Sequence, residues 1–254
     1  MCTLVILRRP GHSWPLLIAA NRDEMIDRAW QSPARHWPDR EDVVGGLDEL
    51  AGGPWLALND NGVTAAILNR EGSLGPTIDK RSRGELVLEA VDHPDAAVAA
   101  EAMLELDGSA YRSFNLIVAD NHDAYWIRGT EQPKVEVVEI PPGLHMITSR
   151  ELNDAESARV GRFLPRFRAA DEPDVETGDW SAWENLLATR LHSSDEDPRE
   201  TMCIVTDKGY GTVSSTLVAL PSAERPDVDA VWHFAPGRPD ATPYEHVILS
   251  LGAQ

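Results

Sequence analysis

The chain has 254 residues, of which 42% are hydrophobic and 26% are charged, as in an ordinary globular protein. The chain has 23 Lys and Arg and 42 Asp and Glu, which gives a formal net charge of −19. This charge argues against nucleic acid or anionic lipid surfaces as partners. With only two cysteines and no apolar run long enough for a bilayer or a secretory signal, we expect a cytoplasmic protein without disulfides or an integral membrane segment.

The first part of the chain alternates short apolar runs with turn residues. Residues 2–7 and 16–20 flank a segment with Pro and Gly, a pattern that predicts a β-hairpin. Residues 55–59 and 63–68 flank Asp60-Asn61-Gly62, and Asn-Gly is the strongest short hairpin signal. Two hairpins are therefore expected before the first helix.

Helices are predicted in two blocks. Ser82-Arg83-Gly84-Glu85 has the form of a capping box and opens an Ala- and Leu-rich helix, which Pro94 interrupts before a second helix to about Leu106. A similar box at Asn153 and Glu156 predicts a helix to about Arg168, and residues 180–191 form a further helical region.

The remaining apolar runs predict strands. They are residues 114–119, 125–128, 135–140, 144–148, 202–205, 212–220, 230–234 and 246–251. Because the helices do not alternate with successive strands, we expect an α+β protein with antiparallel sheet and helices on its faces. No segment is a convincing linker, so residues 1–254 are treated as one domain.

Cys2 is the main candidate for chemistry because of its position. Removal of Met1 is favoured when the second residue is small, and it would leave Cys2 with a free α-amine. That amine has a reference pKa of about 7.7–8.0, so one residue would hold both a nucleophile and a general base. The alternative is that Cys2 is a small apolar residue at the start of an edge strand.

Hairpin geometry brings a polar cluster close to Cys2. If the first hairpin turns near residues 11 and 12, Cys2 pairs with Asn21, and Asn21 and Asp23 share a face that Arg22 does not. Acyl transfer at Cys2 needs an amide to bind an oxyanion and a carboxylate to hold the α-ammonium. A slip of one residue would exchange Arg22 for Asp23, and a solvated turn is the structural alternative.

Several motifs, taken in order along the chain, resemble the NRDE family, also called the transport and Golgi organisation 2 family. They are Met1-Cys2-Thr3-Leu4, Asn21-Arg22-Asp23-Glu24, Gly52-Gly53-Pro54-Trp55, Ser82-Arg83-Gly84, Phe114-Asn115-Leu116 and Ser214-Ser215-Thr216. The resemblance covers essentially the whole chain. It implies the four-layer αββα fold of N-terminal-nucleophile (Ntn) hydrolases, with two antiparallel sheets between helical layers.

The resemblance also implies roles for individual residues. As in penicillin and bile-salt acylases, Cys2 would be the nucleophile, Asn21 the oxyanion donor and Asp23 the residue that orients the α-amine. Arg22 follows the Asn, whereas the Arg of those acylases precedes it, and Arg22 and Glu24 would shape the substrate site or pair with each other. Ser149 stands where many relatives have an Asn, and loss of such an oxyanion donor costs roughly 3–4 kcal/mol in a known case.

Two functions follow from these residues. The first is hydrolysis of a C–N bond in an amide of a small or lipid-like substrate. The alternative is a non-catalytic protein that traffics haem or binds acyl-CoA or lipid. The eight His residues form no metal-binding pattern, so no metal or other cofactor is predicted, and haem enters only as a candidate bound ligand.

Overall fold

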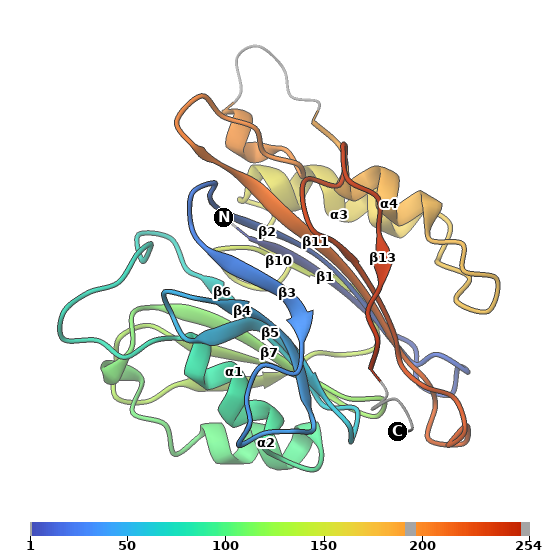
Figure 1. The fold of residues 1–254 in the computed structure, drawn as a ribbon, viewed down its shortest axis with the longest axis horizontal. Coiled ribbons are helices and arrows are strands. Elements are labelled where there is room, and N and C mark those ends of the chain that lie inside the picture. Colours follow the sequence, from blue (N-terminus) through green and yellow to red (C-terminus); the bar gives the residue numbers. More distant parts are fainter. Residues whose placement is uncertain (1, 191–196, 250–254) are drawn as a thin grey trace.

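The computed structural model describes residues 2–190 and 197–249. Two antiparallel sheets pack face to face, and helices cover the outer face of each (Figure 1). The predicted four-layer α+β fold is therefore confirmed. Within the described ranges, no helix has the length and apolar character needed to cross a membrane.

The first sheet has the strand order β10-β1-β2-β11-β12-β13 and carries α3 and α4 on its outer face. The second has the order β3-β4-β5-β6-β7-β8-β9 and carries α1 and α2. The strands are β1 Thr3–Arg8, β2 Leu16–Met25, β3 Trp30–Ala34, β4 Val43–Asp48, β5 Gly53–Asn59, β6 Thr64–Asn69, β7 Phe114–Ala119, β8 Ala124–Gly129, β9 Glu136–Glu139, β10 Gly143–Ile147, β11 Tyr210–Leu220, β12 Val231–Ala235 and β13 Glu245–His246. The helices are α1 Gly84–Val91, α2 Ala96–Met103, α3 Ala158–Ala169 and α4 Ser181–Leu187.

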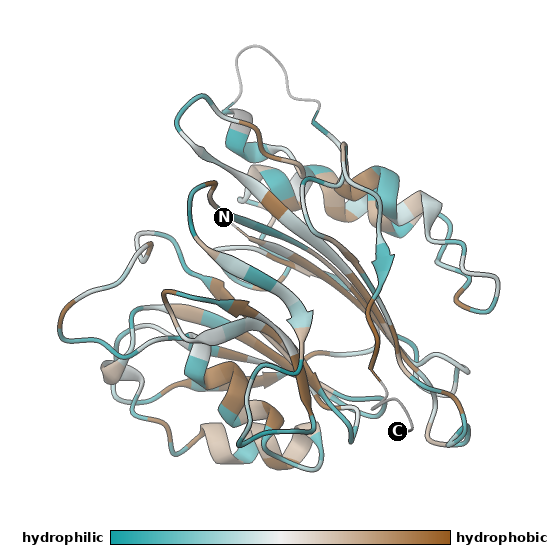
Figure 2. Ribbon diagram, in the orientation of Figure 1, coloured by the Kyte–Doolittle hydropathy of each residue, from teal (hydrophilic) through white to brown (hydrophobic). Residues whose placement is uncertain are grey.

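Three apolar clusters hold these layers together, and Figure 2 shows the apolar strands at their centre. Leu4 and Ile6 of β1 face the cluster between the sheets, whereas Val5 and Leu7 face the cluster under α3 and α4. Both faces of β1 are therefore buried, which explains why its sequence is a continuous apolar run rather than an alternating one.

The predicted register of the first hairpin is wrong by one residue. Thr3, and not Cys2, pairs with Asn21, because the connection closes with a hydrogen bond from the Arg9 N–H to the Pro15 carbonyl. Cys2 therefore shares its side of the sheet with Arg22. Since side chains alternate along a strand, Asn21 and Asp23 point to the helix-covered face instead.

The helices differ from the prediction mainly at their ends. Ser82 does not cap α1, whose N-cap is Arg83, and α2 begins after Asp95, whose carboxylate accepts from the Val98 N–H. The helix predicted from Asn153 begins only after Ser157, because the Asn153 side chain instead accepts a hydrogen bond from the Met146 N–H of β10. Residues 202–205 form no strand, and residues 191, 250 and 251 of the predicted elements lie outside the described residues.

Candidate active site

Cys2 lies immediately before β1, at one end of the space between the sheets. It lines a cavity of about 240 Å³ whose other walls come from the end of β2, residues 48–55 around the β4–β5 turn, and residues 75–84 before α1. A smaller cavity of about 30 Å³ is also lined by Cys2. The candidate nucleophile thus faces a partly open cavity large enough for part of a ligand.

The Cys2 thiol lies among charged groups. Its Sγ is 3.7 Å from the backbone oxygen of Asp23. Burial raises the pKa of this thiol above its ordinary value and the charge of Asp23 adds to the effect, while Arg22 opposes it. Near neutral pH the sulfur therefore keeps its proton, and attack on a substrate requires a nearby base.

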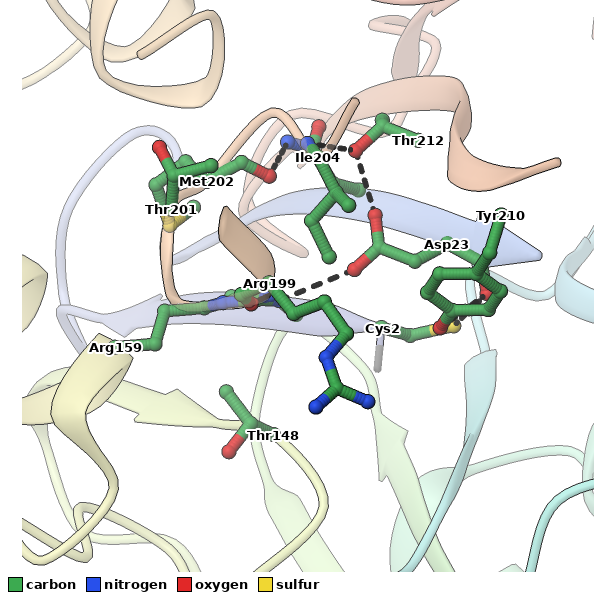
Figure 3. Close-up of polar contacts among 12 residues, drawn as sticks. Cys2, Asp23, Thr148, Arg159, Arg199, Thr201, Met202, Ile204, Tyr210 and Thr212 are labelled. Atoms are coloured by element: carbon green, nitrogen blue, oxygen red, sulfur yellow. Dashed lines mark hydrogen bonds and ion pairs between the residues drawn. The ribbon is translucent and has the colours of Figure 1, made fainter. Parts of the chain in front are cut away.

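Behind Cys2, the Asp23 carboxylate is held by a buried ion pair (Figure 3). Its Oδ2 lies 3.1 Å from Nη1 of Arg159, and its Oδ1 accepts a hydrogen bond of 2.6 Å from Thr212 Oγ1. The same Arg159 nitrogen donates to Thr3 Oγ1, and the Tyr210 hydroxyl donates to the Asp23 backbone oxygen. With side-chain exposures of 1% for Arg159 and 0% for Asp23, this pair is shielded from solvent.

Sequence reasoning missed Arg159, although the chain carries a signal for it. Arg159 precedes Phe163 and Phe167 at helical spacing, and all three are buried under the first sheet. A cation in the apolar stripe of a helix requires a buried anion, and here that anion is Asp23.

Arg22 crosses from the first sheet to the second. Its Nη2 is 2.6 Å from Asp48 Oδ2 of β4, and its guanidinium lies 4.4 Å from the ring centroid of Trp55 in β5. Its Nη1 is buried and has no hydrogen-bond partner among the residues that the structure describes. An unused N–H donor therefore lies in the residue that shares the Cys2 side of the sheet.

Asp48 also binds Arg28, and the two contacts hold the carboxylate in place. Arg28 Nε lies 2.6 Å from Asp48 Oδ2 and 3.8 Å from Glu24 Oε2. Burial alone would raise the pKa of Asp48, but the hydrogen bonds from Arg28 and the Ala51 N–H hold that pKa below its ordinary value. Glu24 thus lies beside Arg28 at the rim, rather than beside Arg22.

Asn21 and Ser149 have surroundings that differ from those expected. Asn21 Nδ2 donates to the carbonyls of Leu187 and Met202 at 3.0 and 2.9 Å, and Oδ1 accepts from Ser215. Both amide hydrogens are thereby used on the helix-covered face of the sheet. Ser149 is buried in the segment after β10, and it is not one of the described residues that line the cavities around Cys2.

No metal site accompanies this arrangement in the part of the chain that the structure describes, where no group of three or more His, Cys, Asp or Glu side chains could hold an ion. Among the described residues that line the cavity there is no His or Met, and Cys2 is the one sulfur ligand.

We expect Cys2 to be alkylated at least about tenfold faster than Cys203 at pH 8. Cys203 is fully buried, and burial together with Asp240, whose Oδ1 is 3.3 Å from the sulfur, raises its pKa to about 12. Cys2 is only partly buried and lines the cavity. Timed iodoacetamide labelling with peptide mapping measures both rates, and equal rates would contradict the prediction.

Comparison with known structures shows which proteins share this fold. A Caenorhabditis elegans N-acylethanolamine-hydrolyzing acid amidase ortholog aligns with a TM-score of 0.56 and 13% identity, over 85% of this chain and 92% of that one. A conjugated bile acid hydrolase from Clostridium perfringens gives 0.50 and 10%, over 98% and 97%, and penicillin V acylase from Agrobacterium tumefaciens gives 0.50 and 11%, over 92% and 83%. The fold is therefore that of the Ntn hydrolases.

Sequence comparison is more specific. The chain belongs to the transport and Golgi organisation 2 family, whose model matches residues 1–228. It is 30% identical over 179 residues to the Transport and Golgi organization protein 2 homolog of Bos taurus, and 31% identical over 150 residues to that of Homo sapiens. These matches span 61% and 54% of this chain and 62% and 51% of the relatives.

Proposed function

We propose that this protein is a cysteine amide hydrolase of the Ntn type, with Cys2 as nucleophile after removal of Met1. The observation that carries the proposal is that Cys2 faces a cavity with the buried Asp23–Arg159 pair behind it and the Arg22 guanidinium beside it. The solved structures that share the fold are named for hydrolysis of N-acylethanolamines and conjugated bile acids and for acylase action on penicillin V. We infer an amide of a small or lipid-like acid as the substrate.

In the proposed mechanism the free α-amine of Cys2 takes the thiol proton as Sγ attacks the amide carbonyl. The carbonyl oxygen becomes negative, and Arg22 Nη1 is the donor that we assign to it in place of Asn21. When the C–N bond breaks, the α-ammonium returns its proton to the leaving amine. Water then hydrolyses the thioester, which releases the acid and the thiol. Asp23, held by Arg159, keeps the amine oriented.

A non-catalytic binding protein is the second candidate. It is favoured by the contacts of Asn21, the expected oxyanion donor, whose amide hydrogens are used elsewhere. Ser149, which stands where many relatives have a donor Asn, is likewise not among the described residues that line the larger cavity. A lipid or acyl-CoA carrier would use the cavity without reaction at Cys2. A haem carrier would use Cys2 as the axial ligand, since the described residues that line the cavity include no His, Met or Tyr.

We expect the mature protein to begin at Cys2. A retained Met1 would convert the α-nitrogen of Cys2 into an amide without basicity, and the proposed base would be lost. Intact mass of protein expressed without an N-terminal tag measures this directly. Full retention of Met1 in active protein would exclude the α-amine as the base.

A further inference from the structure

The cavity wall is strongly cationic in a protein of net charge −19. Among the described residues that line it, three are acidic: Asp23, Glu24 and Asp48. Six are basic: Arg22, Arg28, Lys80, Arg81, Arg83 and Arg112. Four of these six have carboxylate partners, because Arg22 and Arg28 pair with Asp48, Lys80 with Glu131 and Arg81 with Glu85.

Arg83 and Arg112 are different, since their hydrogen-bond partners among the described residues are neutral backbone and hydroxyl groups. Arg83 Nη1 donates to the carbonyls of Ser73 and Ser113 at 2.9 and 3.1 Å. Arg112 donates to the carbonyls of Gly72, Leu74 and Gly75, at 2.7, 2.5 and 3.2 Å. Within residues 2–190 and 197–249 neither side chain forms an ion pair, and Arg83 Nε and Nη2 have no hydrogen-bond partner.

The positive charges of Arg83 and Arg112 also repel each other, and both residues line the same cavity as Cys2. Burial and the neighbouring Arg112 lower the pKa of Arg83 to about 10, and Arg28 acts in the same direction, while Cys2 and Glu24 act against it. Two partly buried cations without a counterion are costly, and an incoming anion would relieve that cost. Backbone carbonyls hold the guanidinium groups in position without neutralising them, which leaves the charge available to a ligand.

We propose that the substrate carries an anionic group, a carboxylate, sulfonate or phosphate, that binds to Arg83 and Arg112 while its amide carbonyl meets Cys2. This inference rests on the proposed function for the identity of the reacting bond. The anion site itself depends only on the arrangement of the two arginines.

Two alkylating reagents of nearly the same size test the site without knowledge of the substrate. Iodoacetate and iodoacetamide both transfer their methylene carbon to sulfur with loss of iodide, but only iodoacetate is an anion. We expect Cys2 to prefer iodoacetate by about tenfold at low ionic strength, and we expect the preference to fall as salt screens the charges. Arg83→Gln and Arg112→Gln should each lower the rate ratio several-fold, whereas Arg83→Lys should largely keep it.

Arg40→Gln is the matched control. It removes the same charge, but from an exposed pair with Asp92 that does not line the cavity, so the ratio should not change. Because the ratio compares two reagents on one variant, a partial loss of folded protein cancels. A wild-type ratio at or below that of a free thiol, or one that neither glutamine variant lowers, would overturn the inference.

A second arm separates this inference from the proposed function. Binding of N-decanoylglycine, N-decanoyltaurine and N-decanoylethanolamine O-phosphate to the Cys2→Ala variant is compared with binding of neutral N-decanoylethanolamine. Preference for one or more anionic compounds, without hydrolysis by the wild type, would support the anion site and contradict the hydrolase. Hydrolysis of the neutral amide at the same rate as the anionic ones would support the hydrolase and overturn the anion site.

Discussion

Replacing Cys2 with alanine is expected to lower kcat/KM for amide hydrolysis by at least about 10³-fold, because the substitution removes both the attacking sulfur and the covalent intermediate. Turnover of a panel of fluorogenic N-acyl amides with increasing acyl length, measured for wild type and variant, checks this. The variant keeps a small second residue, so removal of Met1 is unaffected.

Two controls make the result specific to Cys2 as an N-terminal residue. Cys203→Ala removes the other thiol, which lies outside the cavity, and should leave turnover within about twofold of wild type. Insertion of a serine between Met1 and Cys2 keeps the thiol but turns its α-amine into an amide, and this should cost nearly as much activity as Cys2→Ala. Full activity in the serine-extended protein would show that another group is the base.

Replacing Arg159 with methionine is expected to lower the free energy of unfolding by about 3–5 kcal/mol, since it leaves a buried carboxylate without its cation. The side chains of Arg159 and Asp23 are 1% and 0% exposed, and solvent cannot replace the lost partner. Chemical denaturation followed by far-UV circular dichroism measures the change. A loss below about 1 kcal/mol would contradict the structural role of the pair.

The double variant Asp23→Leu/Arg159→Met distinguishes loss of the whole ion pair from loss of one of its two charges. Because buried ion pairs can be replaced by apolar residues of similar volume at little cost, we expect it to be more stable than Arg159→Met alone. Arg168→Met is the control on the same helix. Arg168 is exposed, and its one hydrogen-bond partner among the described residues is the Leu144 carbonyl, so its loss should cost less than about 1 kcal/mol.

Strands marked by an apolar run or a turn motif could be predicted from the sequence. A strand whose residues are selected by packing against a neighbouring strand could not. β1, β5 and β6 were predicted because apolar runs and the Asn61-Gly62 turn reflect local physics. β4 was missed because Gly45 and Gly46 resemble a turn. Packing accounts for these glycines instead, since a Cβ on Gly46 would lie 2.3 Å from the Trp55 ring, and one on Gly45 would make a tight contact of 3.1 Å with Ala57 Cβ.

For the candidate site, the sequence by itself indicated the candidate nucleophile, the family and the polar cluster at the end of β2, because these lie in short contiguous motifs. The tertiary structure decided which side of the sheet each polar residue takes, since a shift of one residue in the hairpin brings Arg22 to the Cys2 side and turns Asn21 away. The tertiary structure also decided which charged side chains lie next to one another. Arg159 reaches Asp23, and Arg83 and Arg112 meet at one cavity wall, across sequence separations at which no local pattern operates. Packing of the two sheets and their helices brings these charges together.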